Sequence, residues 1–362
     1  MSHHLSPTLG LLFTAFCSAA LAADPDPLFH KHDVFVSGTE DTHTFRIPAL
    51  LKTRSGDILA LCEARRANGA DHGDIDLVLR RSTDGGRTWS GVQVIADNGT
   101  HTMGNPAPVL DKRTGTIWLP FSQDNKRVLL ISSRDDGKTW SKPRDVTQDV
   151  LPKDWHWVGP GPGHGIQLLL GAHAGRLVVP CWAGVERDVP FGATQLSYVI
   201  YSDDGGRNWK HGRPATINHS DECQVVELKD GRLYMNARSR MGKRRRAFCF
   251  SQDGGQTWSP IRNDPAMPER SCQGSTIRLG PGLIGVAHPV DEQARRKLTV
   301  RASRDECRTW PVSRVVDAGA AAYSDMVVNQ RGEVLVAYES RQYRAITVAR
   351  FNLTWLTATD KP

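Results

Sequence analysis

Five copies of one eight-residue motif, which we call the Asp-box, constrain the fold of this chain more than any other feature. Each copy follows the pattern S-x-D-x-G-x-T-W, with Asn for Thr in the third copy and Cys for Gly in the last. Asp accepts backbone N–H groups in a tight turn, Gly tolerates a positive φ, and Trp buries a large ring. The aspartates are spaced 49 to 69 residues apart, at Asp84, Asp135, Asp204, Asp253 and Asp305. A turn repeated at such spacing predicts a repeat architecture rather than five parts of one site.

The segments that precede the Asp-boxes have the pattern of short β-strands. Runs such as "IDLVLRRS", "KRVLLISS" and "QLSYVIYS" are rich in β-branched and apolar residues and lack Pro. Four short strands in about 50–60 residues match one blade of a β-propeller. The length of the chain then predicts an all-β fold, a six-bladed β-propeller that forms a single domain over residues 23–362. One blade would lack an Asp-box, and a large β-sandwich is the alternative.

Residues 1–22 contain no Lys, Arg, Asp or Glu, and their apolar stretch ends in the small residues "ALA". This pattern is typical of a secretory signal peptide, so we expect export to the periplasm or the medium. No later apolar run reaches about 18 residues, so no membrane span is expected.

Cysteine usage and charge narrow the functions further. Cys17 lies in the expected signal peptide, and the other six cysteines form no C-x-x-C pair, which argues against a zinc or redox cluster. An exported chain leaves room for one or two disulfides among them. The formal net charge of +7 favours an anionic substrate. No nucleic-acid partner is expected, because exported proteins rarely meet nucleic acid.

The segment "TFRIPAL" places a charged residue within an apolar strand. A guanidinium is always ionised, and its burial without a partner is costly. Alternation along a strand puts Phe45 and Ile47 on one face and Arg46 on the other. Pro48 suits a strand at the inner edge of a ring, because Pro donates no ladder hydrogen bond. Arg46 is therefore expected to face a central pocket.

Asp-boxes together with an early "FRIP" resemble the bacterial-type exo-sialidase (neuraminidase) family, and the likeness covers nearly all of residues 23–362. The resemblance implies that three arginines hold the carboxylate on the anomeric carbon of a sialoside, since guanidiniums bind carboxylates bidentately. The matching residues are Arg46, Arg238 in "GRLYMNAR" and Arg301 in "LTVRASRDECRTW". Nearby arginines compete for two of these roles: Arg240 for the second, and Arg295, Arg296 and Arg304 for the third.

The resemblance also implies a general acid/base in a Gly-rich loop after the first arginine. Asp71 in "DHGDID" follows the "FRIP" arginine by 25 residues and would protonate the leaving oxygen and then deprotonate water. Asp74 and Asp76 are rivals, and a calcium-loop interpretation of the three acids lacks the later Glu and a full ligand set. A further substrate-contacting arginine of the family matches Arg65, with Arg66 as the alternative.

The nucleophile implied by the resemblance is a tyrosine, here Tyr323 in "AAAYSDMVV", with Glu222 in "DECQVVEL" as its base. A carboxylate nucleophile would be repelled by the carboxylate already on the anomeric carbon, whereas a neutral phenol is not. The phenol has an ordinary pKa of about 10, so it needs a base at neutral pH. Tyr343 and Asp221 are the rivals. Glu339 in "VLVAYES" matches a family glutamate that holds the first arginine from behind.

These implications predict an exported exo-α-sialidase that removes terminal sialic acid from glycoproteins, glycolipids or oligosaccharides with retention. The chemistry needs neither a metal nor an organic cofactor. The alternative enzyme is a trans-sialidase, in which a sugar acceptor replaces water. The alternative from another class is a catalytically inactive sialoglycan-binding propeller, which has no need of Asp71, Glu222 and Tyr323 together.

Two further segments lead to predictions, one about the pocket and one about a turn. The Gly- and Pro-rich loop 154–168 resembles a family loop near the pocket, so Trp155, His156 and Trp157 are expected close to the substrate. Cys307 stands where the other Asp-boxes have Gly, and a distorted turn is expected there if that position requires a positive φ.

Overall fold

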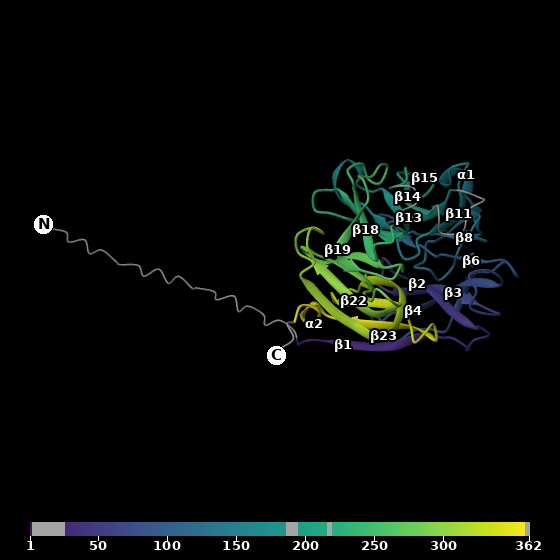
Figure 1. The fold of residues 1–362 in the computed structure, drawn as a ribbon, viewed down its shortest axis with the longest axis horizontal. Helices are drawn as coiled ribbons and strands as arrows, with labels where there is room; N and C mark the ends of the chain where they lie inside the picture. The colour runs from purple at the N-terminus through teal and green to yellow at the C-terminus, as the bar shows by residue number, and fades with distance from the viewer. Residues whose placement is uncertain (2–25, 186–194, 216–218, 359–362) are drawn as a thin grey trace.

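The computed structural model describes residues 26–185, 195–215 and 219–358, together with Met1. Apart from Met1, the expected signal peptide lies outside the described residues. The described strands form antiparallel sheets that follow one another around a central axis (Figure 1). The long strand β23 (Val312–Val328) belongs to two of them, because it pairs with one neighbour up to Ala320 and with another from Ala321. The fold is thus a six-bladed β-propeller, as predicted, and the β-sandwich alternative is wrong.

The blades occur in chain order. Blade 1 contains β2 (Thr44–Lys52), β3 (Ile58–Arg65), β4 (Ile75–Ser82) and β5 (Gln93–Ala96). Blade 2 contains β6 (Met103–Gly104), β7 (Val109–Leu110), β8 (Ile117–Gln123), β9 (Arg127–Ser133) and β10 (Arg144–Asp145). Blade 3 contains β11 (His156–Pro160), β12 (Ile166–Gln167), β13 (Leu177–Gly184), β14 (Gln195–Ser202) and β15 (Lys210–His211).

The second half of the ring continues this order. Blade 4 contains β16 (Ser220–Glu227), β17 (Leu233–Ser239), β18 (Arg245–Ser251) and β19 (Arg262–Pro268). Blade 5 contains β20 (Ser275–Gly280), β21 (Leu283–Pro289), β22 (Arg296–Ser303) and the first part of β23. Blade 6 contains the rest of β23, β24 (Val334–Ser340), β25 (Ala345–Phe351) and β1 (Phe29–Val36). The short helices are α1 (Thr147–Val150), the 3-10 turn η1 (Gly171–His173) and α2 (Leu353–Thr357).

The first strand of the chain closes the ring. β1 pairs with β25 from Phe29 opposite Phe351 to Val36 opposite Ala345, so the N-terminal strand is the outer strand of the last blade. Each Asp-box forms the turn between the last two strands of its blade. Blade 6 has no such turn, because its fourth strand comes from the other end of the chain. Ring closure therefore explains why six blades carry five Asp-boxes.

The Asp-boxes share one hydrogen-bonding pattern. In the first, the Ser82 hydroxyl donates to Asp84 Oδ1 at 2.8 Å, and the same carboxylate accepts the N–H groups of Arg87 and Thr88 at 2.9 and 3.0 Å. The serine and aspartate are linked in the same way in the other four. These bonds satisfy backbone donors within the turn, which supports a structural role for the repeat.

Cys307 keeps the hydrogen bonds of this turn and has the positive φ at which strain was expected for a residue other than Gly. Its φ is +67°, and its N–H donates to Ser303 Oγ at 2.9 Å, as the N–H of Gly86 donates to Ser82 Oγ at 2.7 Å. A Cβ at Gly86 would lie 2.2 Å from a methyl carbon of Leu335. The Cys307 side chain is instead accommodated in the neighbouring core, where it is buried in a cluster with Ile284 and Trp310.

The Asp-boxes and the loop that carries Asp71 lie at opposite ends of the propeller. Antiparallel pairing places the Asp-boxes at one end of the blades and the loop between β3 and β4 at the other.

All six described cysteines are buried and free, so the structure contains no disulfide among them. No helix in the described part of the chain is long and apolar enough to cross a membrane.

Candidate active site

A cavity at the end opposite the Asp-boxes gathers six of the eight predicted site residues. Its walls are Arg46, Ile47, Glu63, Arg65, Asp71, Thr102, Asn105, Asn125, Trp157, Trp182, Asp221, Glu222, Arg238, Arg240, Arg295 and Tyr323. The seventh, Glu339, lies directly behind Arg46, to which it is bonded. The eighth, Arg301, is not among the lining residues. The cavity receives side chains from all six blades, so it exists only where the blades converge.

Arg46 is held from behind by Glu339. Its Nε donates to Glu339 Oε1 at 2.7 Å and its Nη2 donates to Oε2 at 3.1 Å, a bidentate pair in which both side chains are buried. Burial alone would lower the pKa of Arg46, but the Glu339 carboxylate outweighs it and raises the pKa above its ordinary value. The same carboxylate accepts the N–H of Tyr323 at 3.2 Å. One buried acid therefore orients both a guanidinium and the strand that carries the tyrosine.

The backbone at Ile47 departs from simple alternation. The register of β2 against β3 shifts between Arg46 and Ala49, and Ile47 has a φ of +61°, which is rare for a β-branched residue. Its N–H donates to Glu339 Oε1 at 2.9 Å. Ile47 packs against Tyr323 at the cavity and is not in the cluster that holds Phe45, so the prediction that both face one side is wrong. The bulge turns two successive residues toward the centre.

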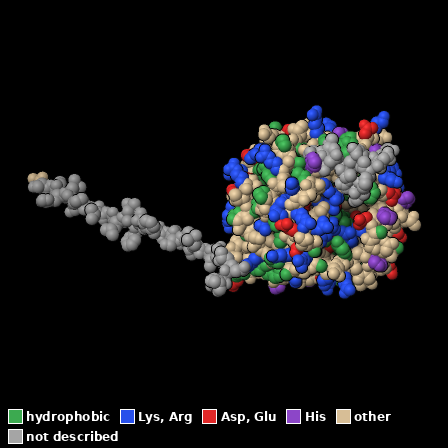
Figure 2. Space-filling model, viewed as in Figure 1, with side chains coloured by type: hydrophobic (Ala, Val, Ile, Leu, Met, Phe, Trp, Pro, Cys, Tyr) green, Lys and Arg blue, Asp and Glu red, His purple; other side chains and the backbone are tan. Residues whose placement is uncertain are grey.

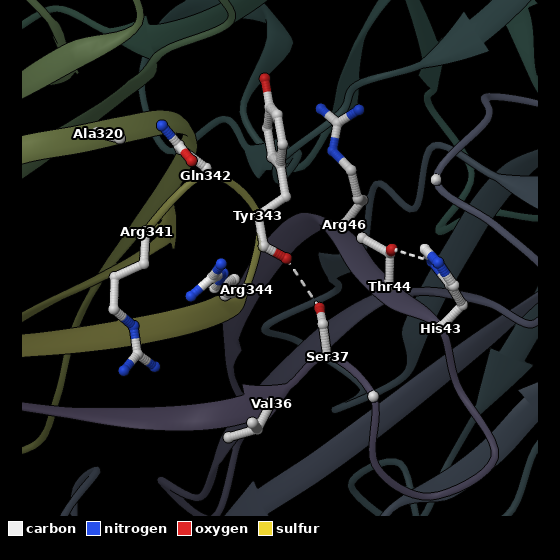
Figure 3. Close-up of a pocket in the computed structure, with 12 residues that line it drawn as sticks. Val36, Ser37, His43, Thr44, Arg46, Ala320, Arg341, Gln342, Tyr343 and Arg344 are labelled. Atoms are coloured by element: carbon white, nitrogen blue, oxygen red, sulfur yellow. Dashed lines mark hydrogen bonds between the residues drawn. The ribbon is translucent and has the colours of Figure 1, made fainter.

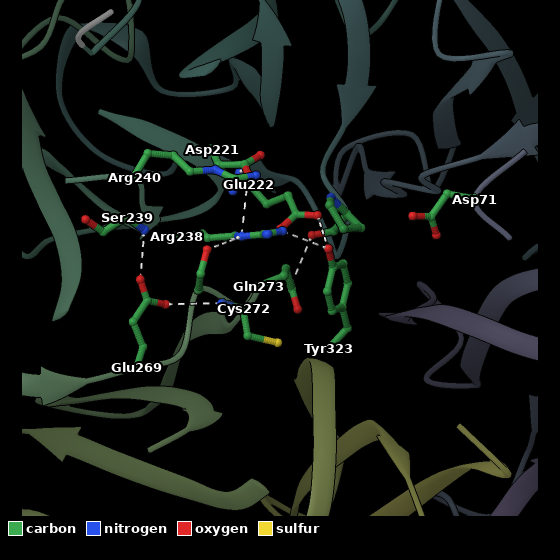
Figure 4. A network of polar contacts seen from close by, with 12 residues as sticks. Asp71, Asp221, Glu222, Arg238, Ser239, Arg240, Glu269, Cys272, Gln273 and Tyr323 are labelled. Atoms are coloured by element: carbon green, nitrogen blue, oxygen red, sulfur yellow. Dashed lines mark hydrogen bonds and ion pairs between the residues drawn. The ribbon is translucent and has the colours of Figure 1, made fainter. Parts of the chain in front are cut away.

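Tyr323, Glu222 and Arg238 form one network, drawn in Figure 4. The Tyr323 hydroxyl donates to Glu222 Oε1, and Arg238 Nη1 donates to Glu222 Oε2 at 2.8 Å and to the Tyr323 oxygen at 3.1 Å. Burial and the nearby Glu222 carboxylate raise the pKa of Tyr323 well above its ordinary value, against the lowering effect of Arg238. The phenol is therefore neutral at rest and has a carboxylate ready to accept its proton.

Asp71 projects into the cavity from the loop between β3 and β4. Its side chain is 71% exposed, and its Oδ1 accepts Arg65 Nη1 at 2.6 Å and Arg46 Nη1 at 3.4 Å. Partial burial raises the pKa of Asp71, but the two guanidiniums outweigh it and lower the pKa below its ordinary value. Arg65 thus lines the cavity, whereas its rival Arg66 pairs with Asp76 at 2.6 Å outside it.

The third arginine of the site is Arg295, and the placement of Arg301 is wrong. Arg295 lines the cavity, with its guanidinium carbon 5.4 Å from the ring centre of Tyr323. Arg301 lies six residues further along β22, roughly 20 Å away at the usual strand rise, and pairs there with Val286 and Ser313 toward the Asp-box end. Arg46, Arg238 and Arg295 are the three guanidiniums that surround the Tyr323 side chain.

Two further carboxylates support the site: sequence reasoning missed Glu63, and it named Asp221 only as a rival base. Glu63 accepts Arg65 Nε and Nη2 at 3.0 and 2.7 Å and also accepts the N–H of Asn105. It stands two residues before Arg65 on β3, and this i, i+2 spacing on one face was a usable signal. Asp221 pairs with Arg240 and accepts the N–H of Glu222 at 2.8 Å. Burial and the Glu222 charge raise the pKa of Asp221, against Arg238 and Arg240.

The tryptophan-rich loop contributes in part. Trp157 lines the cavity together with Trp182, which sequence reasoning did not single out. Trp155 instead packs edge-on against Tyr198, 5.0 Å between ring centres, within the core. His156 is not among the lining residues. No group of three or more His, Cys, Asp or Glu side chains suited to a metal ion occurs among the described residues.

Comparisons with known proteins agree with this architecture. A family profile described as a BNR repeat-like domain matches residues 56–336. A sialidase from Micromonospora viridifaciens is 32% identical over 98% of this chain, which spans 60% of that relative's length. An exo-alpha-sialidase from Aspergillus fumigatus is 30% identical over 94% of this chain and 92% of its own length.

Solved structures give the same result. A Hadza microbial sialidase is 27% identical and superposes with a TM-score of 0.81, over 90% of this chain and 69% of that one. An intramolecular trans-sialidase from Ruminococcus gnavus has a TM-score of 0.78 at 20% identity, over 90% of this chain and 98% of that one, which shows a shared fold. Fold and site together define a propeller with a polar, arginine-rich central cavity. The chain belongs to the BNR-repeat sialidase family, a family of glycoside hydrolases.

Proposed function

We propose that this chain is an exo-α-sialidase that hydrolyses terminal sialic acid with retention, through a covalent intermediate on Tyr323. The observation that carries the proposal is the buried contact between the Tyr323 hydroxyl and Glu222, enclosed by Arg46, Arg238 and Arg295. Arginines alone would suit any carboxylate ligand. A neutral phenol with its own base, aimed into an anion site, is suited to attack on a carbon that bears a carboxylate.

The first half-reaction uses three groups in fixed places. The arginines bind the substrate carboxylate, which aligns the anomeric carbon over the Tyr323 oxygen. Asp71, in its protonated form, gives its proton to the leaving oxygen as the glycosidic bond breaks. Tyr323 forms the new bond to the anomeric carbon and passes its proton to Glu222. Arg238 donates to both of these groups, so it stabilises the negative charge as it moves between them.

The second half-reaction runs in the opposite sense. Asp71, now a carboxylate, removes a proton from a water molecule that attacks the anomeric carbon. The bond to Tyr323 breaks, and the phenol regains its proton from Glu222. Two displacements at one carbon give net retention. A sugar hydroxyl in place of that water would make the chain a trans-sialidase, and the propeller fold shared with such enzymes does not favour either acceptor.

The decisive experiment compares wild type with Tyr323→Phe on a fluorogenic α-sialoside. The expected result is turnover by the wild type and a loss of at least about a thousandfold in the variant. Tyr201→Phe is the matched control, because Tyr201 is a buried tyrosine under Arg176 in blade 3, outside the cavity. Proton NMR of the first product should show the α-anomer of sialic acid. Unchanged activity in Tyr323→Phe would refute the mechanism.

Export is part of the same proposal, because sialylated glycoconjugates lie outside the cell that would secrete this chain. Its support is the uncharged apolar segment over residues 1–22. The expected mature protein begins at Ala23, and N-terminal sequencing of material from the culture medium or periplasm checks this. An intact Met1 on the active protein would contradict it.

A further inference from the structure

A second, larger cavity opens beside the arginine site. Its volume is about 1090 Å³, and it shares Arg46 with the first cavity (Figure 3). One wall is the turn between β24 and β25, with Arg341, Tyr343 and Arg344. The other wall is the start of β2 and the loop that follows β3, including Gly69. In Figure 3, Arg46 and Tyr343 rise side by side from these two walls.

The position of this cavity relates it to the leaving group. Gly69 stands two residues before Asp71, in the same loop, and its carbonyl accepts Arg65 Nη1 at 2.7 Å. In the proposed function, on which this inference rests, Asp71 protonates the oxygen of the departing sugar. That sugar must therefore leave on the side of the Asp71 loop, in which Asp71 lines the first cavity and Gly69 lines the second.

The walls of the second cavity are basic. The residues that line it include three arginines and one histidine, His43, and none of these described lining residues is an Asp or Glu. Arg46 is already paired with Glu339, and Arg341 is paired with Asp33. Arg344 is exposed and has no ion-pair partner among the described residues. Its charge is available to a ligand in the cavity.

The turn that presents these side chains has an uncommon backbone. Arg341, Gln342 and Tyr343 have φ values of +50°, +57° and +67°, a run of left-handed residues without glycine. Ser37 secures it, because its N–H donates to the Arg344 carbonyl at 2.9 Å and its hydroxyl to the Tyr343 carbonyl at 2.8 Å. Such strain persists only where surrounding contacts impose it, and it often marks a functional segment.

Tyr343 ties this turn to the substrate arginines. Its ring centre lies 4.5 Å from the guanidinium carbon of Arg46, and its hydroxyl accepts Arg295 Nη1 at 3.4 Å. The Tyr343 ring thus forms part of the wall between the carboxylate-binding arginines and the basic cavity. A flat apolar ring next to a free guanidinium is a common surface for a sugar that carries a negative charge.

We propose that the second cavity is the subsite for the sugar on the leaving side of the scissile bond, and that it favours a sugar bearing an anionic group. The carboxylate of a second sialic acid is the group to which we commit, and a sulfate on galactose presents the same chemistry. Arg344 contributes the selective charge. A neutral galactose would use the same space without that attraction.

The experiment measures kcat/KM for three oligosaccharides with wild type and Arg344→Gln. They are 3′-sialyllactose, the same compound with a 6-sulfate on galactose, and an α2,8-linked disialyl oligosaccharide. An exposed charge pair corresponds to about a two- to fivefold effect, so Arg344→Gln should lose that factor on the charged substrates only. Raising the salt concentration should remove the same preference in the wild type. Comparison of the disialyl substrate with the sulfated substrate shows whether Arg344 favours a carboxylate or a sulfate.

The controls keep this inference separate from the proposed function. Arg134→Gln removes an exposed charge in the second Asp-box turn, at the far end of the blade, and should leave every ratio unchanged. Equal losses on neutral and charged substrates in Arg344→Gln, or no loss on either, would overturn the inference while sialidase activity stands. If the wild type cleaves no sialoside at all, the proposed function fails and this inference fails with it.

Discussion

Replacing Glu339 with Gln tests the most concentrated set of contacts in the site. Glu339 is fully buried and accepts two bonds from Arg46, one from the N–H of Ile47 and one from the N–H of Tyr323. Glutamine has nearly the same shape and keeps one acceptor oxygen. The change therefore removes the negative charge behind Arg46 and turns one acceptor into a donor, while it leaves the volume of the core unchanged.

The size of the effect follows from the burial of Arg46. Its side chain is 10% exposed, and after the change its nearest carboxylate would be the exposed Asp71 at 3.4 Å. Removal of one partner from a buried ion pair costs about 3–5 kcal/mol. For a folded unit of this length the unfolding entropy is roughly 0.7 kcal/mol/K, so Tm should fall by about 4–7 °C. Activity should fall at least about a hundredfold, since the arginine and the tyrosine both lose their orientation.

Thermal unfolding followed by circular dichroism, with kcat/KM measured well below Tm, separates the two effects. Glu333→Gln is the matched control, because Glu333 pairs with Arg350 at 2.8 Å in a buried site at the Asp-box end of β24, away from the cavity. It should lower Tm and leave kcat/KM within about twofold of the wild type. If Glu339→Gln kept both Tm and activity, the reasoning from the buried pair would be refuted.

Three further predictions follow from the same geometry. Arg295→Gln should lower kcat/KM by about ten- to 150-fold, which corresponds to the loss of one hydrogen bond to a charged group. Arg301→Gln should leave kcat/KM within about twofold of the wild type. Steady-state kinetics on one sialoside compares the two variants. Asp71 must be protonated to act as the acid, so kcat/KM for sialyllactose should fall as pH rises through its pKa. Because two guanidiniums lower this pKa, the fall should begin below the ordinary titration range of Asp, and a pH profile of Asp71→Asn should lack that limb. Cys307→Gly should change the unfolding free energy by less than about 1 kcal/mol in urea, because relief of a left-handed conformation offsets the buried thiol.

The propeller was predictable because its signal is local and repeated. Each Asp-box encodes its own turn through contacts within eight residues, such as those of Asp84 with Ser82 and Thr88. Five such turns at blade-length spacing determine the count of blades once the chain length is known. Sequence reasoning predicted that one of the six blades would lack an Asp-box, but it offered no structural cause. That cause, the pairing of β1 with β25 across the whole chain, is a long-range contact that no local pattern contains.

Site residues were predictable where a short sequence motif identified them through their immediate neighbours. Arg46, Asp71 and Tyr323 stand in short segments whose neighbours specify them, and all three line the cavity. The prediction for Arg301 was wrong because strand periodicity shows which face of a strand a side chain lies on, but not how far along the blade it lies. Arg295, six residues earlier, stands just before β22 and so reaches the cavity end. The choice among neighbouring arginines needed the register with β21, which is a tertiary property.

The bulge at Ile47 shows why a simple alternation rule could not describe the centre of the ring. Arg46 belongs to the innermost strand of blade 1, while Glu339 and Tyr323 belong to blade 6, so these residues meet only after β1 has closed the circle. A regular strand would turn Ile47 away from that meeting point. The positive φ instead points its N–H at the carboxylate that already holds Arg46. The backbone strain at the "FRIP" segment is thus offset by a contact across the seam of the ring, and the anion site and the closed propeller form together.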